Sequence, residues 1–170
     1  MLDVEAAWLA GIMDGEGCIY IDRLMPTPAN KKKQPVYKLN LSVAMTDERT
    51  IRRIAEITGV GCVYKLPTYN PNHSAIYRWQ AANQNAAAIL PQIAPYLVTK
   101  KEQGELGLEF IAIPRWQSRK DLAIQQQREA CYWRLKALKP RVRPVRNNER
   151  WVPRETLHGQ VQSYAADADS

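Results

Sequence analysis

The sequence has few cysteines, no long apolar run and no basic residue near its start. Its three cysteines, Cys18, Cys62 and Cys131, are widely separated and form no C-x-x-C pair. This usage indicates free thiols in a reducing compartment and argues against a zinc site. No run of about 18 apolar residues is present, which argues against a transmembrane helix. The absence of Lys and Arg before the first apolar stretch also does not fit a secretory signal.

The composition favours an acidic partner. The 170 residues carry a formal net charge of +7 and show no bias towards disordered or repetitive sequence. A chain of this length fits one globular domain with a substantial core. Nucleic acid is the commonest acidic partner of a basic protein, and an anionic membrane surface is the alternative. Charge alone does not decide between them, but the chain offers no amphipathic Lys-rich helix for a membrane surface.

Apolar periodicity divides the chain into helices and strands. The clearest pattern lies in residues 36–45, where apolar and polar residues alternate as in a strand with one buried face. A helix is expected at 3–13, with Asp3 as its N-cap, and Gly15 and Gly17 are expected to end it. The remaining predicted elements are a strand at 18–24, a helix at 47–58, strands at 61–66 and 74–81, and helices at 83–94, 100–112 and 119–138.

This order, α-β-β-α-β-β-α with extra C-terminal helices, predicts an α+β fold built on an antiparallel sheet. We place one domain at residues 1–138, with a core spanning residues 5–112, and a basic, proline-containing C-terminal extension at 139–170. The first part of that extension, residues 139–154, carries six basic residues, one acid and three prolines.

One segment, Leu9 to Gly17, combines small residues with two acids. The small residues Ala7, Gly11 and Gly15 leave one helical face nearly bare, so two such helices could pack backbone to backbone. Glu16 lies where the chain leaves the helix, and a pair of packed helices would therefore bring two carboxylates together. Divalent cations between two such carboxylates suit phosphodiester hydrolysis. The alternative is an ordinary helix with a glycine-rich end and a solvated glutamate.

Residue by residue, LAGIMDGEG is similar to the LAGLIDADG signature of a homing endonuclease family. The Leu-Ala-Gly opening, the Asp at the sixth place, the acid at the eighth and the closing Gly all match, and Ile12-Met13 and Gly15 are common variants. MTDERTIRRIAEITGVG resembles the second-helix region of single-motif members, and IAPYLVTKKEQ resembles their Pro-aromatic-Leu-x-x-Lys stretch. The resemblance covers residues 5–112. It implies an αββαββα fold whose antiparallel sheet forms a saddle in the DNA major groove.

The resemblance also implies an active site. Glu16 and Gly15 would bind the metal, which we expect to be Mg²⁺, with Mn²⁺ substituting and Ca²⁺ binding without supporting cleavage. Lys100 falls at the family's active-site lysine, with Lys101 as the alternative if the alignment shifts by one. Asp47 falls where relatives commonly carry a polar residue, frequently Gln, near the metal-bound water, so a catalytic Asp47 would contact that water or the metal. It is equally explained as a helix N-cap.

Two further features of the site region follow from the resemblance. A basic residue of the second helix supports the site in relatives, and Arg49, Arg52 and Arg53 are the candidates. The counterpart of Asp14 is structural rather than metal-bound, so Asp14 is interpreted as a hydrogen-bonding residue at the helix end.

The polar face of the predicted sheet is the candidate DNA surface. We expect Arg78 to pair with guanine, Asn40 or Gln80 with adenine, and Asp22 to accept from cytosine. Lys38 would contact phosphate. The alternative is a solvated face of mixed polarity. The full predicted set on the sheet is Tyr20, Asp22, Leu24, Lys38, Asn40, Ser42, Tyr64, Leu66, Arg78 and Gln80.

Basic residues outside the sheet extend this surface. Lys31, Lys32 and Lys33 would meet the DNA backbone at the outer end of the site, although a bare charge run is commonly solvated. The segment 139–154 would either follow phosphates beyond the sheet or form a tail without fixed contacts.

The motif occurs once, so the predicted enzyme is a homodimer with Ala7, Gly11, Ile12 and Gly15 at its interface. It would cut both strands of a long pseudo-palindromic double-stranded DNA target, leaving 3′ overhangs, and would act inside a cell, in bacterial or phage-infected cytoplasm or an organelle. Its gene would lie in an intron, an intein or a free-standing frame. The alternatives are an RNA-splicing maturase, which would bind RNA, and a non-catalytic DNA-binding regulator.

Overall fold

The computed structural model describes residues 1–27, 34–67, 72–114 and 121–139. Lys31, Lys32 and Lys33, and the extension from residue 140 onward, lie outside the described residues. The elements in chain order are α1 (Asp3–Glu16), β1 (Gly17–Leu24), β2 (Val36–Met45), α2 (Glu48–Thr58), β3 (Cys62–Lys65), β4 (Tyr77–Ala82), α3 (Gln84–Ile93), the short 3₁₀ helix η2 (Ala94–Tyr96), α4 (Lys101–Ala112) and α5 (Leu122–Ala137). The predicted α+β order is confirmed.

The sheet is fully antiparallel, with the strand order β1-β2-β4-β3. Its register pairs Tyr20 with Asn40, and Gln80 with both Ser42 and Cys62. Because successive residues of a strand point to opposite faces and paired residues share a face, this register divides the sheet into a polar and an apolar face. The buried apolar side chains are Ile19, Ile21, Leu39, Leu41, Val43, Trp79 and Ala81.

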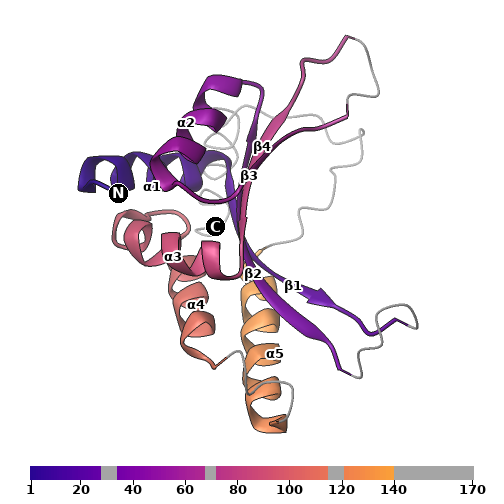
Figure 1. Cartoon of the computed structure of the whole chain (residues 1–170). Helices are drawn as coiled ribbons and strands as arrows, with labels where there is room; N and C mark the ends of the chain where they lie inside the picture. The colour runs from indigo at the N-terminus through magenta and orange to yellow at the C-terminus, as the bar shows by residue number, and fades with distance from the viewer. Residues whose placement is uncertain (28–33, 68–71, 115–120, 140–170) are drawn as a thin grey trace, which may run out of the picture. The chain divides into compact units, whose positions relative to one another are not determined.

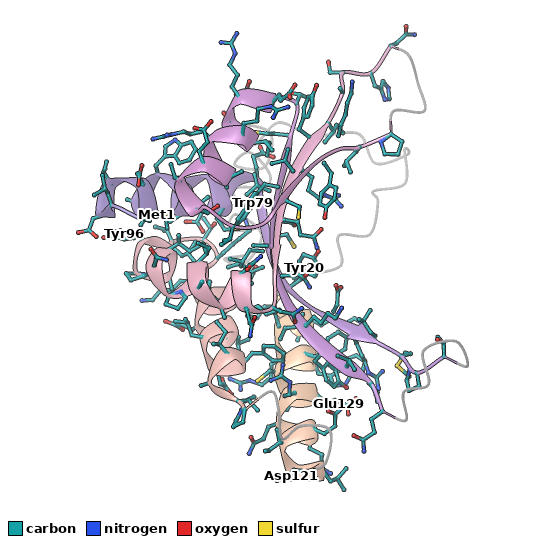
Figure 2. All side chains as sticks on the ribbon, viewed as in Figure 1. Met1, Tyr20, Trp79, Tyr96, Asp121 and Glu129 are labelled. Carbon is teal, nitrogen blue, oxygen red and sulfur yellow. The ribbon has the colours of Figure 1, made fainter. Side chains whose placement is uncertain are left out.

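The helices α1, α2, α3 and α4 cover the apolar face, and no described helix covers the polar face (Figure 1). Figure 2 labels Trp79 between the sheet and the helices, and Tyr20 on the opposite side of the sheet. The core side chains that the helices contribute include Leu9, Met13, Ile51, Ile54, Leu90 and Ile93. Amphipathic patterning therefore explains both the layering and the open face.

Helix α5 extends this layer beside α4 and β1. The buried Arg128 donates to the carbonyl of Ile113 at 3.0 Å, and its guanidinium lies 4.0 Å from the ring centroid of Phe110. Glu129 forms an ion pair with Arg23 of β1 at 2.9 Å. A buried charge is tolerated only with such partners. The Arg128 contacts join α5 to α4 and to the residue after it, and the Glu129–Arg23 ion pair joins α5 to β1.

Helix α1 is longer than the sequence predicts. It continues past the expected end at residue 13, through Gly15 to Glu16. The break comes at Gly17, where a Cβ would lie 2.6 Å from the Cα of Met13. Glycine lowers helix propensity without preventing a helix, and contacts of Asp14 with another segment hold the last turn. Gly17, rather than Gly15, is the position where the close approach requires glycine.

The second hairpin has shorter strands than predicted, because β3 and β4 pair over only four residues of β3. One more backbone hydrogen bond, from Leu66 N to Ile76 O at 2.8 Å, follows the end of the ladder. No helix in the described part of the chain is long and apolar enough to cross a membrane.

Candidate active site and DNA-facing surface

Asp14 holds the C-terminal end of α1 against the segment that leads into α4. Its carboxylate accepts hydrogen bonds from the backbone N–H of Val98 at 2.7 Å and of Lys100 at 2.9 Å. Its main-chain carbonyl accepts from the Thr99 hydroxyl at 3.2 Å. The interpretation of Asp14 as a hydrogen-bonding residue at the helix end is therefore correct, and its partners lie more than eighty residues away in the sequence.

The same contact positions Lys100, the predicted catalytic lysine. Its ammonium donates to the main-chain carbonyl of Asp14, so its side chain lies over the last turn of α1. Lys100 is half-buried, whereas Lys101 is exposed in the first turn of α4. A cation near a helix C-terminus is electrostatically favourable, because uncompensated carbonyls concentrate negative charge there. The structure brings Lys100 to the helix end that carries Glu16.

The carboxyl of Asp14 has a lowered pKa. Burial alone would raise it, but the N–H donors of Val98 and Lys100, together with Thr99, outweigh burial because they stabilise the charged form. The clamp between α1 and α4 is therefore made by an ionised carboxylate at neutral pH.

Glu16 ends α1 with an exposed carboxylate that makes no hydrogen bond or ion pair with any residue described. The Gly15 main-chain carbonyl lies in the same last turn of the helix. Carboxylate and carbonyl oxygens at the negative end of a helix suit a hard divalent cation. Within the described residues, no group of three or more His, Cys, Asp or Glu side chains could hold a metal ion.

Asp47 is the N-cap of α2. Its carboxylate accepts from the backbone N–H of Thr50 at 3.1 Å and from the Thr50 hydroxyl at 2.6 Å. These bonds lower the pKa of the exposed Asp47. The capping alternative offered by the sequence is thus observed, and a catalytic role for Asp47 stays a prediction.

The arginines of α2 have different partners. Arg52 pairs with Glu48 on the same helix, and Arg53 pairs with Glu5 of α1 at 3.3 Å. Arg49 is exposed and forms no ion pair with a described residue. Arg49 is thus the candidate whose guanidinium is not already paired.

One face of α1 is bare of contacts. Gly11 and Gly15 are exposed, and a Cβ built on either meets nothing within 4 Å. Ala7 is also exposed, and Ile12 is half-buried. Ala7, Gly11 and Gly15 therefore share one open helix surface, whereas Ile12 packs partly against the core.

Sequence reasoning missed the continuation of that surface. Trp8 is 39% exposed, and Val4 one turn earlier is 73% exposed. They border a hollow of about 380 Å³ between α1 and α2, lined also by Glu5, Arg53 and Ile57. The i, i+4 spacing of Val4 and Trp8 was the signal that could have revealed an apolar stripe beside the small residues.

The predicted DNA-facing residues of the sheet lie together on its polar face. The register pairs Asp22 with Lys38, Tyr64 with Arg78, and Leu24 with Val36, while Leu66 lies just beyond β3. One further cation, Lys139, lies at this face, although the sequence analysis places it in the C-terminal extension. The ammonium of Lys139, just after α5, lies 2.9 Å from the Cys18 sulfur and 5.5 Å from the ring centroid of Tyr20.

Asn40 differs from the expectation of an exposed polar residue. It is only 2% exposed, because its amide bonds to Asp22, Gln80 and the main chain of Lys38. Strand alternation predicts the face of a side chain, but it does not reveal that neighbouring polar groups on that face cover one another.

Comparison with known proteins identifies the family. Residues 9–104 match the family model described as LAGLIDADG endonuclease. The chain belongs to the LAGLIDADG endonuclease family. No curated protein sequence matches the chain.

Solved structures share the fold. The homing endonuclease I-CvuI, in complex with its target in the presence of Ca, has a TM-score of 0.69 and 20% identity, over 96% of each chain. The archaeal intron-encoded I-Vdi141I, complexed with DNA, has a TM-score of 0.67 and 12% identity, over 96% of this chain and 98% of that one. The group I intron-encoded I-CeuI, also complexed with DNA, has a TM-score of 0.64 and 15% identity, over 87% of this chain and 71% of that one.

The Asp14 clamp predicts that this LAGLIDADG protein loses stability at acid pH. Because the folded pKa lies below the ordinary value of 3.8, the stabilisation is present above pH 3.8 and is lost as pH falls through the folded pKa. Asp14→Asn should lower the free energy of unfolding by about 1–3 kcal/mol at neutral pH, and this difference should shrink below pH 3.8. Urea unfolding between neutral and acid pH measures this, with the exposed Glu105→Gln as control. If the free energies of unfolding of wild type and Asp14→Asn differed by the same amount at every pH in that range, the prediction would be contradicted.

The capping role of Asp47 predicts different effects for two substitutions. Asp47→Ala removes the acceptor for the Thr50 N–H and should cost about 1 kcal/mol of stability. Asp47→Asn retains an acceptor oxygen and should unfold close to wild type, because Asn caps helices as well as Asp does. Thermal unfolding of both variants tests the cap. An equal loss of thermal stability in both variants would mean that the charge of Asp47, rather than its capping geometry, stabilises the fold.

Proposed function

We propose that this chain is a homodimeric, Mg²⁺-dependent homing endonuclease that cuts both strands of a long, pseudo-palindromic DNA target. The observation that carries the proposal is the end of α1, where the exposed carboxylate of Glu16 and the ammonium of Lys100 lie at one end of a glycine-lined helix. Membership in the LAGLIDADG endonuclease family supports nuclease activity. Complexes of I-CvuI, I-Vdi141I and I-CeuI with DNA support the substrate class.

Each active site would be assembled from residues of this chain. Glu16 and the Gly15 carbonyl would hold divalent cations, which supply Lewis-acid stabilisation of the phosphodiester oxygens. I-CvuI was crystallised with DNA in the presence of Ca and, with another target left uncleaved, of Mg, which supports a divalent metal. Lys100, held by Asp14, places a positive charge where the phosphate acquires negative charge, and it can orient the attacking water.

The proposal of a dimer rests on the number of Glu16 carboxylates that one chain supplies. One chain supplies one Glu16, whereas two helices packed through their bare faces would place two of these carboxylates together. Gly11 and Gly15 would then allow close backbone approach. Two-fold symmetry of the protein requires a near-palindromic target, with one polar sheet face in the major groove of each half-site. Cuts in both strands would leave 3′ overhangs, and the enzyme would act where its DNA lies inside the cell.

The catalytic assignment predicts loss of cleavage without loss of binding. Glu16→Gln removes the carboxylate charge, and Lys100→Met removes the ammonium but keeps most of the side-chain volume. Both variants should bind the target and fail to cut it in Mg²⁺, because removal of a charge-stabilising group costs about 10²-fold or more in rate. The exposed Glu102→Gln and Lys101→Met are the matched controls and should cut. Asp47→Asn should also cut, because it keeps a polar side chain at the position where relatives frequently carry Gln.

The assay uses a supercoiled plasmid that carries the two flanks of the gene joined together. Wild type should give linear product with Mg²⁺ and bind without cutting in Ca²⁺. Cleavage by Glu16→Gln would contradict the mechanism. Binding without cleavage by wild type in either cation would indicate a regulator, and preferential binding of intron RNA would indicate a maturase.

The dimer proposal predicts that enlarging Gly11 separates the chains. A Cβ at Gly11 meets no atom of the described residues within 4 Å, and Gly11→Leu replaces a poor helix former, so the monomer should not be destabilised. At a packed two-fold interface the added side chain occurs twice, and the variant should sediment as a monomer that cannot cut DNA. Wild type and the exposed Ala130→Leu on α5 should sediment as dimers. A dimeric Gly11→Leu variant would place the interface on another surface.

A further inference from the structure

A continuous polar network crosses three strands of the DNA-facing surface. The Gln80 amide nitrogen donates to the Tyr20 hydroxyl at 3.1 Å and to the Asn40 side-chain oxygen at 3.3 Å. The Asn40 amide nitrogen donates to the Asp22 carboxylate and to the Lys38 carbonyl, both at 3.0 Å. The residues thus form a connected set rather than independent side chains.

The orientation of both amides is fixed by these partners. The Asn40 nitrogen faces a carboxylate oxygen and a carbonyl oxygen, and neither of these can donate. Its own oxygen therefore faces Gln80 and requires a donor there. Among the described residues the Gln80 nitrogen supplies that donor, so each amide has a single orientation that satisfies the network.

Asn40 is consequently unsuited to contact a base. It is buried, both of its N–H bonds are donated and its oxygen is accepting. Breaking these bonds to reach DNA would leave buried polar groups without partners, which is costly. Its position instead fixes Asp22 and Gln80 on either side of it.

Gln80 retains one free hydrogen-bonding atom. Both N–H bonds are donated to Tyr20 and Asn40, while its side-chain oxygen has no partner among the described residues. A bidentate contact with adenine needs a donor as well as an acceptor from the glutamine. That donor is already used, so Gln80 can only accept from a base.

We propose that Gln80 is an acceptor-only reader of the DNA target, selecting a base with an exocyclic amino group, and that Asn40 is the positioning residue that holds it. The proposal rests on the endonuclease function above. In the major groove the exocyclic amino donors are N4 of cytosine and N6 of adenine, whereas guanine and thymine present only acceptors at the corresponding atoms. One position in each half-site should therefore exclude guanine and thymine on the strand that Gln80 faces.

A selection of binding sites tests this proposal. Full-length protein is incubated in Ca²⁺ with double-stranded DNA carrying a randomised insert, and bound molecules are sequenced. The base position whose preference changes in Gln80→Lys identifies the Gln80 contact. Wild type should enrich cytosine or adenine there by about three- to tenfold, the worth of one hydrogen bond. Gln80→Lys, which only donates, should reverse the preference to guanine or thymine, while Gln80→Glu, which only accepts, should keep cytosine or adenine.

Asn40→Ala separates a positioning residue from a direct reader. It should abolish the preference at the Gln80 position and leave the position read by Arg78 unchanged. Asn40→Ser is the milder variant, and thermal unfolding checks that both remain folded. Lys38→Met is the control for lost charge on this face, because it leaves the main-chain carbonyl that Asn40 binds. It should weaken binding without changing the base at the Gln80 position.

The outcomes distinguish this proposal from the proposed function. If wild type enriches no sequence, the endonuclease function itself fails. If a sequence is enriched but wild type prefers guanine or thymine at the Gln80 position, the acceptor-only assignment is wrong. If folded Asn40 variants keep the Gln80 preference and lose a different position, Asn40 is itself a reader.

Discussion

The carboxylate of Asp14 joins the end of α1 to the segment that starts α4, and the candidate active site depends on that join. Without it, the last turn of α1 would end in glycines that favour other backbone conformations. With it, α1 continues to Glu16, and Lys100 lies over the same turn. One ionised side chain therefore sets the positions of an acid and a base that are far apart in the sequence.

The two sides of helix α1 differ in what they contact. Leu9 and Met13 face the core, where they pack under the sheet. Gly11 and Gly15 face outward, and a Cβ at either would contact none of the residues that the structure describes. The folded monomer is stabilised by the side that carries Leu9 and Met13. The stability of the monomer therefore does not explain why glycines occupy the other side. That difference is why the bare side is interpreted as a surface for a second chain.

The sequence predicted the fold well, because periodicity and glycine positions are local signals. The alternation in residues 36–45 gave β2 and its faces correctly. The end of α1 was predicted too early, because the contacts that stabilise it come from residues 98–100 and leave no local pattern. Helix α5 was predicted, but its placement against β1 was not, since contacts between them such as the Arg23–Glu129 ion pair join residues more than a hundred positions apart.

The candidate site was predicted less completely than the fold. Resemblance to a family named Glu16 and Lys100, and the structure places Lys100 at the helix end that carries Glu16. It could not decide whether Asp47 caps a helix, because the N-cap geometry depends on the backbone turn before α2. Nor could it distinguish Asn40 from Gln80, since both are amides on the same face and only their hydrogen-bond partners differ.

The network around Asn40 also limits how this surface can change over evolutionary time. Three side chains, Asp22, Asn40 and Gln80, share hydrogen bonds, so replacing one leaves another without a partner. Arg78 of β4 and Tyr64 of the edge strand β3, which pair with each other, lie outside those bonds. Recognition of a drifting target can therefore be adjusted one residue at a time at Arg78 and Tyr64, whereas Asp22, Asn40 and Gln80 must change together.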